Sequence, residues 1–576
     1  MEPTFSAQLH TNYVPPRSEV TQIRNIVLGS LEERARLDEK IARFQAIVDD
    51  LRGQHHKLGI YTEDHLALTS GARRLPHDII QVIFCHCLPT DRNAVMSAKE
   101  PPLLLGRICS GWRRIALSTP DLWTTLHVSI PNCQVSSHYI KWRRVAEAVK
   151  SWLNLSGGLP LSISAACSAL VGGQPDRETS LNITYLMNLF IRHSRRWENI
   201  DFILPIPEFI AIMASLTEAD VPLLKSATLE STVFNPTNLW PSVSILNAPT
   251  LREVSIISFK HTDFLQPLPW AQLTGLHLED STHMWSDTPS LNELDAINIL
   301  KQCSLLVTCK LLVESDPSSL PPQPTLHEVI LPFLRLFILI EGRRTLRSQF
   351  IECLTLPLLE YLGFRSYFAH HIDHPPFPLT IFFTRENKIE ELELEIGATS
   401  TDTWTECLSH ASSIKRLTLI APEQLWAYPP FPALNDHFLS LLTPLSSNDL
   451  LCPSLEEINL KFCEGVTDEK ILLFLRERTN PTHMANGMVV LKRATFTVNR
   501  EMITDIMSDV QQLIAAGLEL DLKYTPPLSL GFTEETEDVD VPGGPHLRAH
   551  YFSRLPDEIF SPLLGLRINR AINTLS

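Results

Sequence analysis

The stretch that decides the fold of the N-terminal part reads RLPHDIIQVIF at residues 74–84 and PPLLLGRICSGWRRIALSTPDLWTTL at residues 101–126. In the first segment Pro76 suits the first position of a helix, and Asp78 lies in the first turn, where the helix dipole favours a negative charge. The pattern predicts a short helix that is apolar on two sides, and both sides must be buried, one in its own core and one against something else. The first side is Leu75, Ile79, Val82 and Ile83, and the second is Ile80 and Phe84.

The second segment predicts another helix and the point at which it stops. Its apolar residues are spaced three, four and three positions apart, at Leu105, Ile108, Trp112 and Ile115. The Ser-Thr-Pro sequence at residues 118–120 ends the helix, and the Leu-Trp pair at residues 122–123 packs behind it. Gly111 lies inside this predicted helix, where glycine costs about 1 kcal/mol relative to alanine.

The order of these segments resembles the F-box, in the form that is abundant in mushroom-forming fungi. LPHDIIQVIF is similar to the family's opening Leu-Pro-x-acidic-Ile pattern, ICSGWRRIA to its Val-Cys-x-x-Trp-Arg pattern, and STPDLWTTL to its Ser-Thr-Pro-x-Leu-Trp close. The resemblance implies an F-box helical bundle over residues 71–128 that docks on a Skp-family adaptor and, through it, on a cullin. The alternative is an ordinary helical hairpin that uses Trp112 and Trp123 only as core.

The two-sided helix and the helix after it supply the expected adaptor contacts. We expect Leu75, Pro76 and Ile80 at the contact, together with Phe84 and Leu104, whereas Trp112 also supports the core. The full set of expected adaptor-binding residues is Leu75, Pro76, Ile79, Ile80, Ile83, Phe84, Leu104, Leu105, Ile108 and Trp112.

The composition is that of an acidic globular protein. Its 576 residues suffice for several domains, and a hydrophobic content of 44% provides material for a core. Asp and Glu total 65 against 49 Lys and Arg, and the formal net charge is −16. Such a chain is a poor binder of phosphate backbones and anionic surfaces, so we expect neither nucleic acid nor a membrane among its partners.

The cysteines and the N-terminal residues indicate a cytoplasmic or nuclear location. The eleven cysteines are an odd number and scattered, which fits free thiols in a reducing compartment. Cys85 and Cys87 lie two positions apart without a second pair at zinc-finger spacing, so we interpret them as helix packing. The first twenty residues lack the pattern of a secretory signal, and the apolar run at residues 333–340, broken by Arg335, is too short to span a bilayer.

The region before the F-box-like segment divides in two. Residues 1–18 are expected to be disordered, and residues 19–66 to form a long amphipathic, coiled-coil-like helix. Nine of the twelve core positions of its heptad pattern are apolar, but Ser30, Arg34 and His55 interrupt it. The helix therefore either self-associates or pairs with a partner helix, or it folds back on the chain's own body, which the interruptions favour slightly.

Short alternating segments follow the F-box-like region and predict strands. LWTTLHVSI, LPLSISAA and RWENIDFIL come first, and a leucine-led pattern then recurs from residues 251, 273, 358, 389, 414, 455 and 491. This pattern is that of a leucine-rich-repeat strand. The expected fold is therefore a mainly α N-terminus, helix plus F-box bundle, followed over residues 129–525 by an irregular α/β leucine-rich-repeat solenoid. The alternative is a non-repetitive α/β domain, and residues 526–576 are expected to be an acidic linker and tail.

The sequence shows no motif of an enzyme. It lacks a glycine-rich phosphate loop, a zinc-finger spacing and a nucleophile elbow, so we expect no catalytic residue, no cofactor and no metal. His370, His371, Asp373 and His374 could in principle bind a metal, but such a loop is more often simply exposed.

These observations predict a substrate-receptor subunit of a cullin-type SCF ubiquitin ligase, with the F-box on the adaptor and the repeats on a protein substrate. The alternative is a non-ligase interaction scaffold with the same fold. Outward positions of the predicted strands are acidic in the later repeats, which suggests a basic or neutral epitope. The expected substrate-binding residues are Arg252, Glu391, Glu393, Lys415, Glu456 and Glu457.

Overall fold

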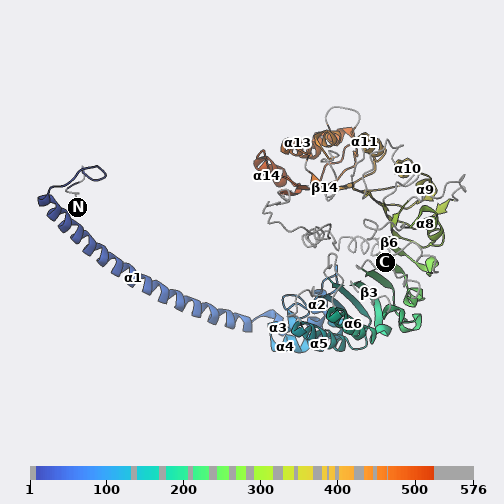
Figure 1. Cartoon of the computed structure of the whole chain (residues 1–576), viewed down its shortest axis with the longest axis horizontal. Coiled ribbons are helices and arrows are strands. Elements are labelled where there is room, and N and C mark those ends of the chain that lie inside the picture. Colours follow the sequence, from blue (N-terminus) through green and yellow to red (C-terminus); the bar gives the residue numbers. More distant parts are fainter. Residues whose placement is uncertain are drawn as a thin grey trace, which may run out of the picture. The chain divides into compact units, whose positions relative to one another are not determined.

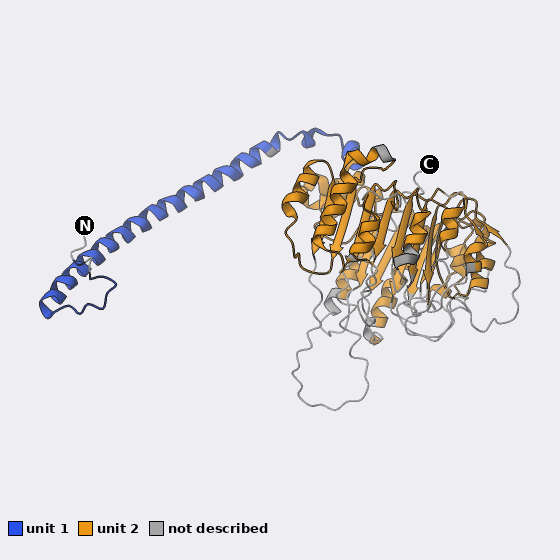
Figure 2. Cartoon of the chain, turned by 90° about the horizontal axis from the view of Figure 1, so that it is seen from above, with its two compact units in different colours: residues 1–82 blue, residues 83–576 orange. Residues whose placement is uncertain are grey.

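The structure is a computed structural model of the chain. It describes residues 5, 8–130, 139–167, 177–204, 212–231, 243–257, 268–279, 291–314, 328–342, 348–366, 379–385, 388–395, 401–420, 434–444, 450–463 and 465–524. The chain divides into two compact units, residues 1–82 and residues 83–576 (Figure 2). The predicted acidic tail, residues 526–576, and most of the first seven residues lie outside the described residues.

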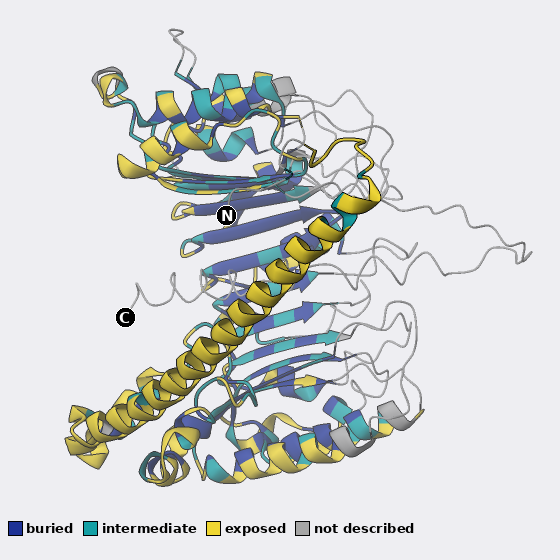
Figure 3. Cartoon of the chain, turned by 90° about the vertical axis from the view of Figure 1, so that its left-hand side faces the viewer, coloured by how far each residue is buried: buried dark blue, intermediate teal, exposed yellow. Residues whose placement is uncertain are grey.

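The segment with the heptad pattern forms one helix, α1 (Arg17–Leu68), of 52 residues. None of its described residues is buried, and Figure 3 shows it exposed along its length. Ile41 and Phe44, two core positions of the heptad, expose 64% and 66% of their surface. Whether this helix self-associates, pairs with a partner helix or packs on the chain's own body stays a prediction.

Short helices make up the F-box-like segment: η1 (Gly71–Arg74), α2 (His77–His86), α3 (Leu105–Ile108), α4 (Ser110–Leu117) and η2 (Pro120–Trp123). The prediction of a single helix from Leu105 to Ile115 is wrong, because the extended backbone of Cys109 separates α3 from α4. The Cys109 Sγ atom accepts a hydrogen bond from the Trp112 backbone N–H at 3.4 Å and so caps α4. Gly111 consequently lies in the first turn of α4, not in a helix interior.

Aromatic side chains form the core of this segment. The rings of Phe84 in α2 and Trp112 in α4 meet edge to face, with centroids 5.0 Å apart. Trp123 is 4% exposed, its indole N–H donates to the Ala116 carbonyl oxygen at 2.9 Å, and its ring lies edge to face against Trp152, 4.8 Å away. Edge-to-face pairs of this kind contribute about 1 kcal/mol each beyond the area that they bury.

The strands of unit 2 build one parallel sheet of fourteen strands, in the order in which they occur in the chain, and a second sheet of two strands, β8 (Val329–Ile330) and β10 (Leu354–Thr355). The large sheet consists of β1 (Thr125–Ile130), β2 (Leu161–Cys167), β3 (Trp197–Leu204), β4 (Ser226–Ser231), β5 (Glu253–Ile257), β6 (Gly275–Glu279), β7 (Thr308–Val313), β9 (Leu336–Glu341), β11 (Tyr361–Ser366), β12 (Glu391–Glu395), β13 (Arg416–Ile420), β14 (Glu457–Cys463), β15 (Arg493–Val498) and β16 (Glu519–Tyr524).

Helices connect these strands on one side of the sheet, as Figure 1 shows for unit 2. They include α5 (Tyr139–Leu155), α6 (Arg177–Ile191), α8 (Glu293–Leu300), α9 (Ser348–Glu352), α10 (Thr380–Thr384), α11 (Thr401–Ser409), α12 (Asp436–Leu441), α13 (Asp468–Thr479) and α14 (Met507–Ala515), with the 3-10 turns η3 (Ser194–Arg196), η4 (Glu218–Asp220), η6 (Ser244–Asn247), η8 (Trp270–Gln272) and η9 (Pro481–Asn486). Within the described ranges, no helix has both the length and the apolar character that a membrane crossing requires.

The fold class expected from the sequence is wrong. The large sheet begins with β1, inside the predicted F-box segment, and β1 pairs in parallel with β2 along its whole length, from Thr125 opposite Ser162 to Ile130 opposite Cys167. The chain is therefore a mixed α/β fold with a long N-terminal helix, and not a mainly α N-terminus followed by a separate irregular leucine-rich-repeat solenoid. The cause is the strand directly after Trp123, which ties the helical segment into the sheet.

Side chains of each strand point alternately to the two faces of the sheet. The face toward the helices carries the core, for example Phe202 of β3, whose ring stacks on Phe190 of α6 at 5.8 Å. We call the opposite face the inner face. In β9 both faces are buried, and Ile338 and Ile340 form an apolar cluster on the inner face with residues of β7 and β11.

A buried guanidinium fixes the connection between α12 and β14. Arg478 of α13 is fully buried and has no carboxylate partner among the described residues. It donates instead to the backbone carbonyl oxygens of Leu442, Leu451 and Cys452, at 2.6, 2.7 and 3.0 Å. Burial lowers the pKa of this guanidinium to about 10, so it keeps its charge at neutral pH.

Candidate functional site

The structure separates the two sides of α2. Ile80 and Phe84 are buried, whereas Leu75, Ile79 and Ile83 expose 37%, 44% and 43% of their surface. The expectation that Ile80 and Phe84 contribute to an adaptor contact is therefore not met by this arrangement, because both side chains are already enclosed. The remaining face of α2, which Pro76 precedes and Val82 extends, is apolar and open to solvent.

The residues expected on the following helices divide in the same way. Leu105 is buried and Trp112 is half-buried against Phe84, whereas Leu104 and Ile108 are exposed. The exposed apolar face of α3 is thus formed by Leu104 and Ile108. Of the ten expected adaptor-binding residues, the structure places six on the surface: Leu75, Pro76, Ile79, Ile83, Leu104 and Ile108.

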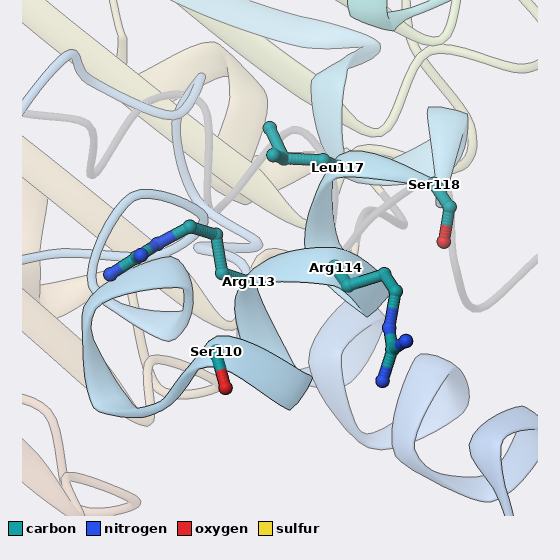
Figure 4. A pocket seen from close by; sticks show the side chains of 5 residues that line it. All are labelled: Ser110, Arg113, Arg114, Leu117 and Ser118. Carbon is teal, nitrogen blue, oxygen red and sulfur yellow. The ribbon is translucent and has the colours of Figure 1, made fainter.

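An open hollow of about 390 Å³ lies on the exposed side of α4 (Figure 4). Its walls come from one face of the helix: Ser110, Arg113, Arg114, Leu117 and Ser118. The Arg113 Nε atom donates to the Gly106 carbonyl oxygen at 2.8 Å, which joins α4 to α3. This hollow is open to solvent, so it extends the exposed face of the segment without forming an enclosed ligand site.

The acidic residues expected to bind substrate are paired across neighbouring strands. Glu391 of β12 accepts from the Arg416 Nε atom of β13 at 2.8 Å. Glu393 accepts from Arg365 at 2.6 Å and from the Tyr361 hydroxyl at 2.8 Å, and it is buried. Their charges are therefore balanced within the sheet.

The other expected substrate residues show the same compensation at the strand starts. Lys492 contacts Glu456 at 2.8 Å, and Arg493 contacts Glu457 at 3.1 Å. Lys415, expected to bind substrate, forms an ion pair with Glu390 at 2.6 Å. Arg252 donates to the carbonyl oxygens of Pro249 and Leu251, at 3.4 and 3.0 Å. The acidic excess read from the later strands is thus largely cancelled by neighbours in the parallel register.

The inner face of β5, β6 and β7 carries a linked polar group that the sequence did not single out as a unit. Both ring nitrogens of His277 form hydrogen bonds, Nδ1 with the Ser255 hydroxyl at 2.8 Å and Nε2 with a Glu279 carboxylate oxygen at 2.9 Å. Lys310 approaches the same Glu279 oxygen at 2.6 Å. Desolvation raises the pKa of Glu279, but the charge of Lys310 and the His277 hydrogen bond outweigh it and hold that pKa far below its usual range.

Serine, histidine and glutamate are the residue types of a hydrolase triad, but this chain is built differently. In a triad the carboxylate accepts a hydrogen bond from the histidine ring and stabilises the imidazolium that forms. Here Lys310 already neutralises Glu279, and desolvation together with the Lys310 charge lowers the pKa of His277. Burial and the Lys310 charge thus disfavour the imidazolium form of His277, whose ring lies between two hydrogen-bond partners.

Two carboxylates on the same face, Asp201 of β3 and Glu230 of β4, lack a basic partner among the described residues. Burial raises the pKa of Asp201 to about 6. Burial, followed by the charges of Glu279 and Asp201, raises the pKa of Glu230 to about 7, with Lys310 acting in the opposite direction. RWENIDFIL, quoted from the sequence as a strand, contains Asp201, but only the strand order shows which charges share its face.

Metal and thiol chemistry have little geometric basis in the described part of the chain. No three His, Cys, Asp or Glu side chains there are grouped so that they could hold a metal ion. Cys85 and Cys87 are free thiols, and the loop with His370, His371 and His374 lies outside the described residues.

Comparison with known proteins adds no identification. No protein-family model matches this chain, and no curated protein matches its sequence.

Proposed function

We propose that this chain is the substrate-receptor subunit of a cullin-type SCF ubiquitin ligase, with a cytoplasmic or nuclear location. The single observation that carries the proposal is the exposed apolar face of α2 within a segment whose motif order resembles the F-box. Ile79, Val82 and Ile83 are each at least 43% exposed, on a helix whose other side is fully packed. Exposed apolar residues gathered on a short element of this kind are typical of a docking surface.

The proposed mechanism uses no chemistry of the chain itself. The F-box-like segment binds the Skp-family adaptor, which links it to a cullin, and the sheet holds a protein substrate. The receptor then raises the effective concentration of a substrate lysine near the ubiquitin-carrying enzyme.

Two matched double variants of the full chain test the adaptor contact. Ile79→Asp with Ile83→Asp alters the exposed face of α2, and Ile26→Asp with Ile47→Asp alters two similarly exposed isoleucines of α1. Each isoleucine buried at an interface contributes about 2 kcal/mol, so the α2 variant should bind the adaptor at least about a hundredfold more weakly. The α1 variant should bind like the parent chain.

Adaptor binding is measured with purified full-length protein by calorimetry or by co-purification. Unchanged binding by a folded α2 variant would contradict the proposal. If the parent chain binds the adaptor but recruits no cullin, the alternative of a non-ligase interaction scaffold is favoured instead.

A further inference from the structure

The inner face of the sheet carries one row of residues in direct register from β2 to β7. Asp201 lies opposite Ser164 of β2 on one side and Thr228 of β4 on the other. The row then continues through Ser255, His277 and Lys310. Asp201 is the only carboxylate at this level between β2 and β7.

The neighbours of Asp201 do not satisfy it. The Ser164 hydroxyl is bound by the Asn93 side-chain amide at 2.9 Å and by a ring nitrogen of His127 at 2.9 Å. One carboxylate oxygen of Asp201, Oδ1, is completely enclosed and has no hydrogen-bond partner in the described ranges. An enclosed polar atom without a partner costs free energy, and an ionised one costs more.

Glu230 adds a second carboxylate on the inner face. It lies two residues after Thr228 in β4, so it is the next side chain of that strand on this face. The charges of Glu279 and Asp201 repel it, and Lys310, which acts in the opposite direction, is already paired with Glu279. Within the described ranges neither Asp201 nor Glu230 thus forms an ion pair with a Lys or Arg side chain. This differs from β12 to β15, where each acidic residue discussed above has its own Arg or Lys.

We infer that the carboxylates of Asp201 and Glu230 form a subsite for a lysine or arginine side chain of a protein partner. Charge complementarity carries the choice of occupant, because Asp201 and Glu230 lie on one face of neighbouring strands and neither has a Lys or Arg of its own within the described ranges. An ammonium or guanidinium group supplies both the charge and the N–H donors. Calling that partner the substrate rests on the proposed function, but the subsite itself does not.

The titration of the two carboxylates agrees with this assignment. A nearby cation favours the ionised form of a carboxylate, whereas burial raises the pKa values of Asp201 and Glu230, which have no ion-pair partner in the described ranges. Glu279, which does have a cation beside it, shows the opposite shift.

The test uses a random dodecapeptide library displayed on phage, selected on three full-length proteins. These are the parent chain, Asp201→Asn with Glu230→Gln, and a control with the same charge change at two exposed carboxylates of α9 and α11, Glu352→Gln with Glu406→Gln. The parent and the control should enrich peptides with lysine or arginine at a fixed position, and the Asp201/Glu230 variant should not. A synthetic copy of the best peptide should bind that variant at least about tenfold more weakly than the parent, and the control about equally.

The outcomes separate the subsite from the proposed function. If the parent enriches no basic residue, or if the Asp201/Glu230 variant binds the peptide as tightly as the parent, the inference is wrong. If the Glu352/Glu406 control loses peptide binding to the same extent, the net charge of the chain sets the selection and the inference is likewise wrong. Adaptor binding, measured on the same three proteins, reports on the proposed function alone, and its presence in all three verifies that the variants are folded. Glu230→Gln alone serves as the second variant if the double variant does not fold.

Discussion

Replacing Asp201 by asparagine should stabilise the protein, and only at neutral and alkaline pH. The substitution keeps the size and one acceptor oxygen of the side chain but removes the charge. In the folded chain burial raises the pKa of this carboxyl from 3.8 to about 6. A carboxyl whose folded pKa is raised destabilises the folded state once the pH exceeds its unfolded pKa, and the penalty is complete above the folded pKa.

The magnitude follows from the size of the shift. A rise from 3.8 to about 6 is roughly two units, and each unit corresponds to about 1.4 kcal/mol, so the penalty at pH 8 is at most about 3 kcal/mol. Below about pH 4 the folded and unfolded chains both carry the protonated acid, and the penalty vanishes. Removing Asp201 also lowers the pKa of Glu230, because the Asp201 charge helps to raise it.

Urea unfolding followed by tryptophan fluorescence, at pH 4 and at pH 8, measures this effect. The midpoint of Asp201→Asn should exceed that of the parent at pH 8 and equal it at pH 4. Asp64→Asn, at an exposed position of α1, is the matched control and should leave the midpoint unchanged at both values. A lower midpoint for Asp201→Asn at pH 8 would show that the ionised carboxylate has a stabilising partner and would refute the reasoning.

Three further predictions concern other parts of the chain. Arg478→Lys should lower the free energy of unfolding by about 3 kcal/mol, measured by urea titration, because one ammonium cannot reach the three buried carbonyl oxygens that the guanidinium satisfies. Asp468→Asn should cost about 2 kcal/mol at pH 7. Its pKa is lowered to about 2, because the hydrogen bonds from Arg500, from two backbone N–H groups and from Tyr524 outweigh desolvation. That stability is fully present above pH 4 and is lost as the pH falls through about 2, so parent and variant should converge in acid. A peptide of residues 20–58 should be partly helical and monomeric at micromolar concentration in analytical ultracentrifugation, since Arg34 lies in its apolar seam.

The periodicity of α2 predicted two apolar sides but could not say which one faces solvent. Ile80 and Phe84 are enclosed because Phe84 packs on Trp112, and that contact depends on where α4 lies, about thirty residues further along the chain. The set expected at the adaptor therefore mixed buried and exposed residues. Cys109 was not recognised as a helix end, since cysteine is not among the usual capping residues.

The leucine-led pattern located β5, β6 and the strands from β11 to β15, because alternation is a local signal, but it did not mark β7 or β9. It could not assign a charge balance, because the partner of Glu391 is Arg416, on the next strand, and that pairing depends on register. For the same reason the later acidic residues were expected to bind substrate, and Asp201, in a segment correctly predicted as a strand, was overlooked. The fold class was wrong at the join after Trp123, where helix-rich and strand-rich segments were treated as separate regions.

The direct connection between Trp123 and β1 determines how rigidly the helical segment is held on the sheet. The N–H of His127 in β1 donates to the Ala94 carbonyl oxygen at 2.8 Å, and the N–H of Ser162 in β2 donates to that of Thr124 at 2.9 Å. Backbone hydrogen bonds thus anchor the helical segment from residue 83 onward to the first strands. Only Thr124 lies between η2 and β1, so no flexible linker separates them. A protein substrate bound on β3 and β4 would therefore be held in one fixed orientation relative to α3 and α4. Its position on the sheet would then decide which of its surface lysines can be reached.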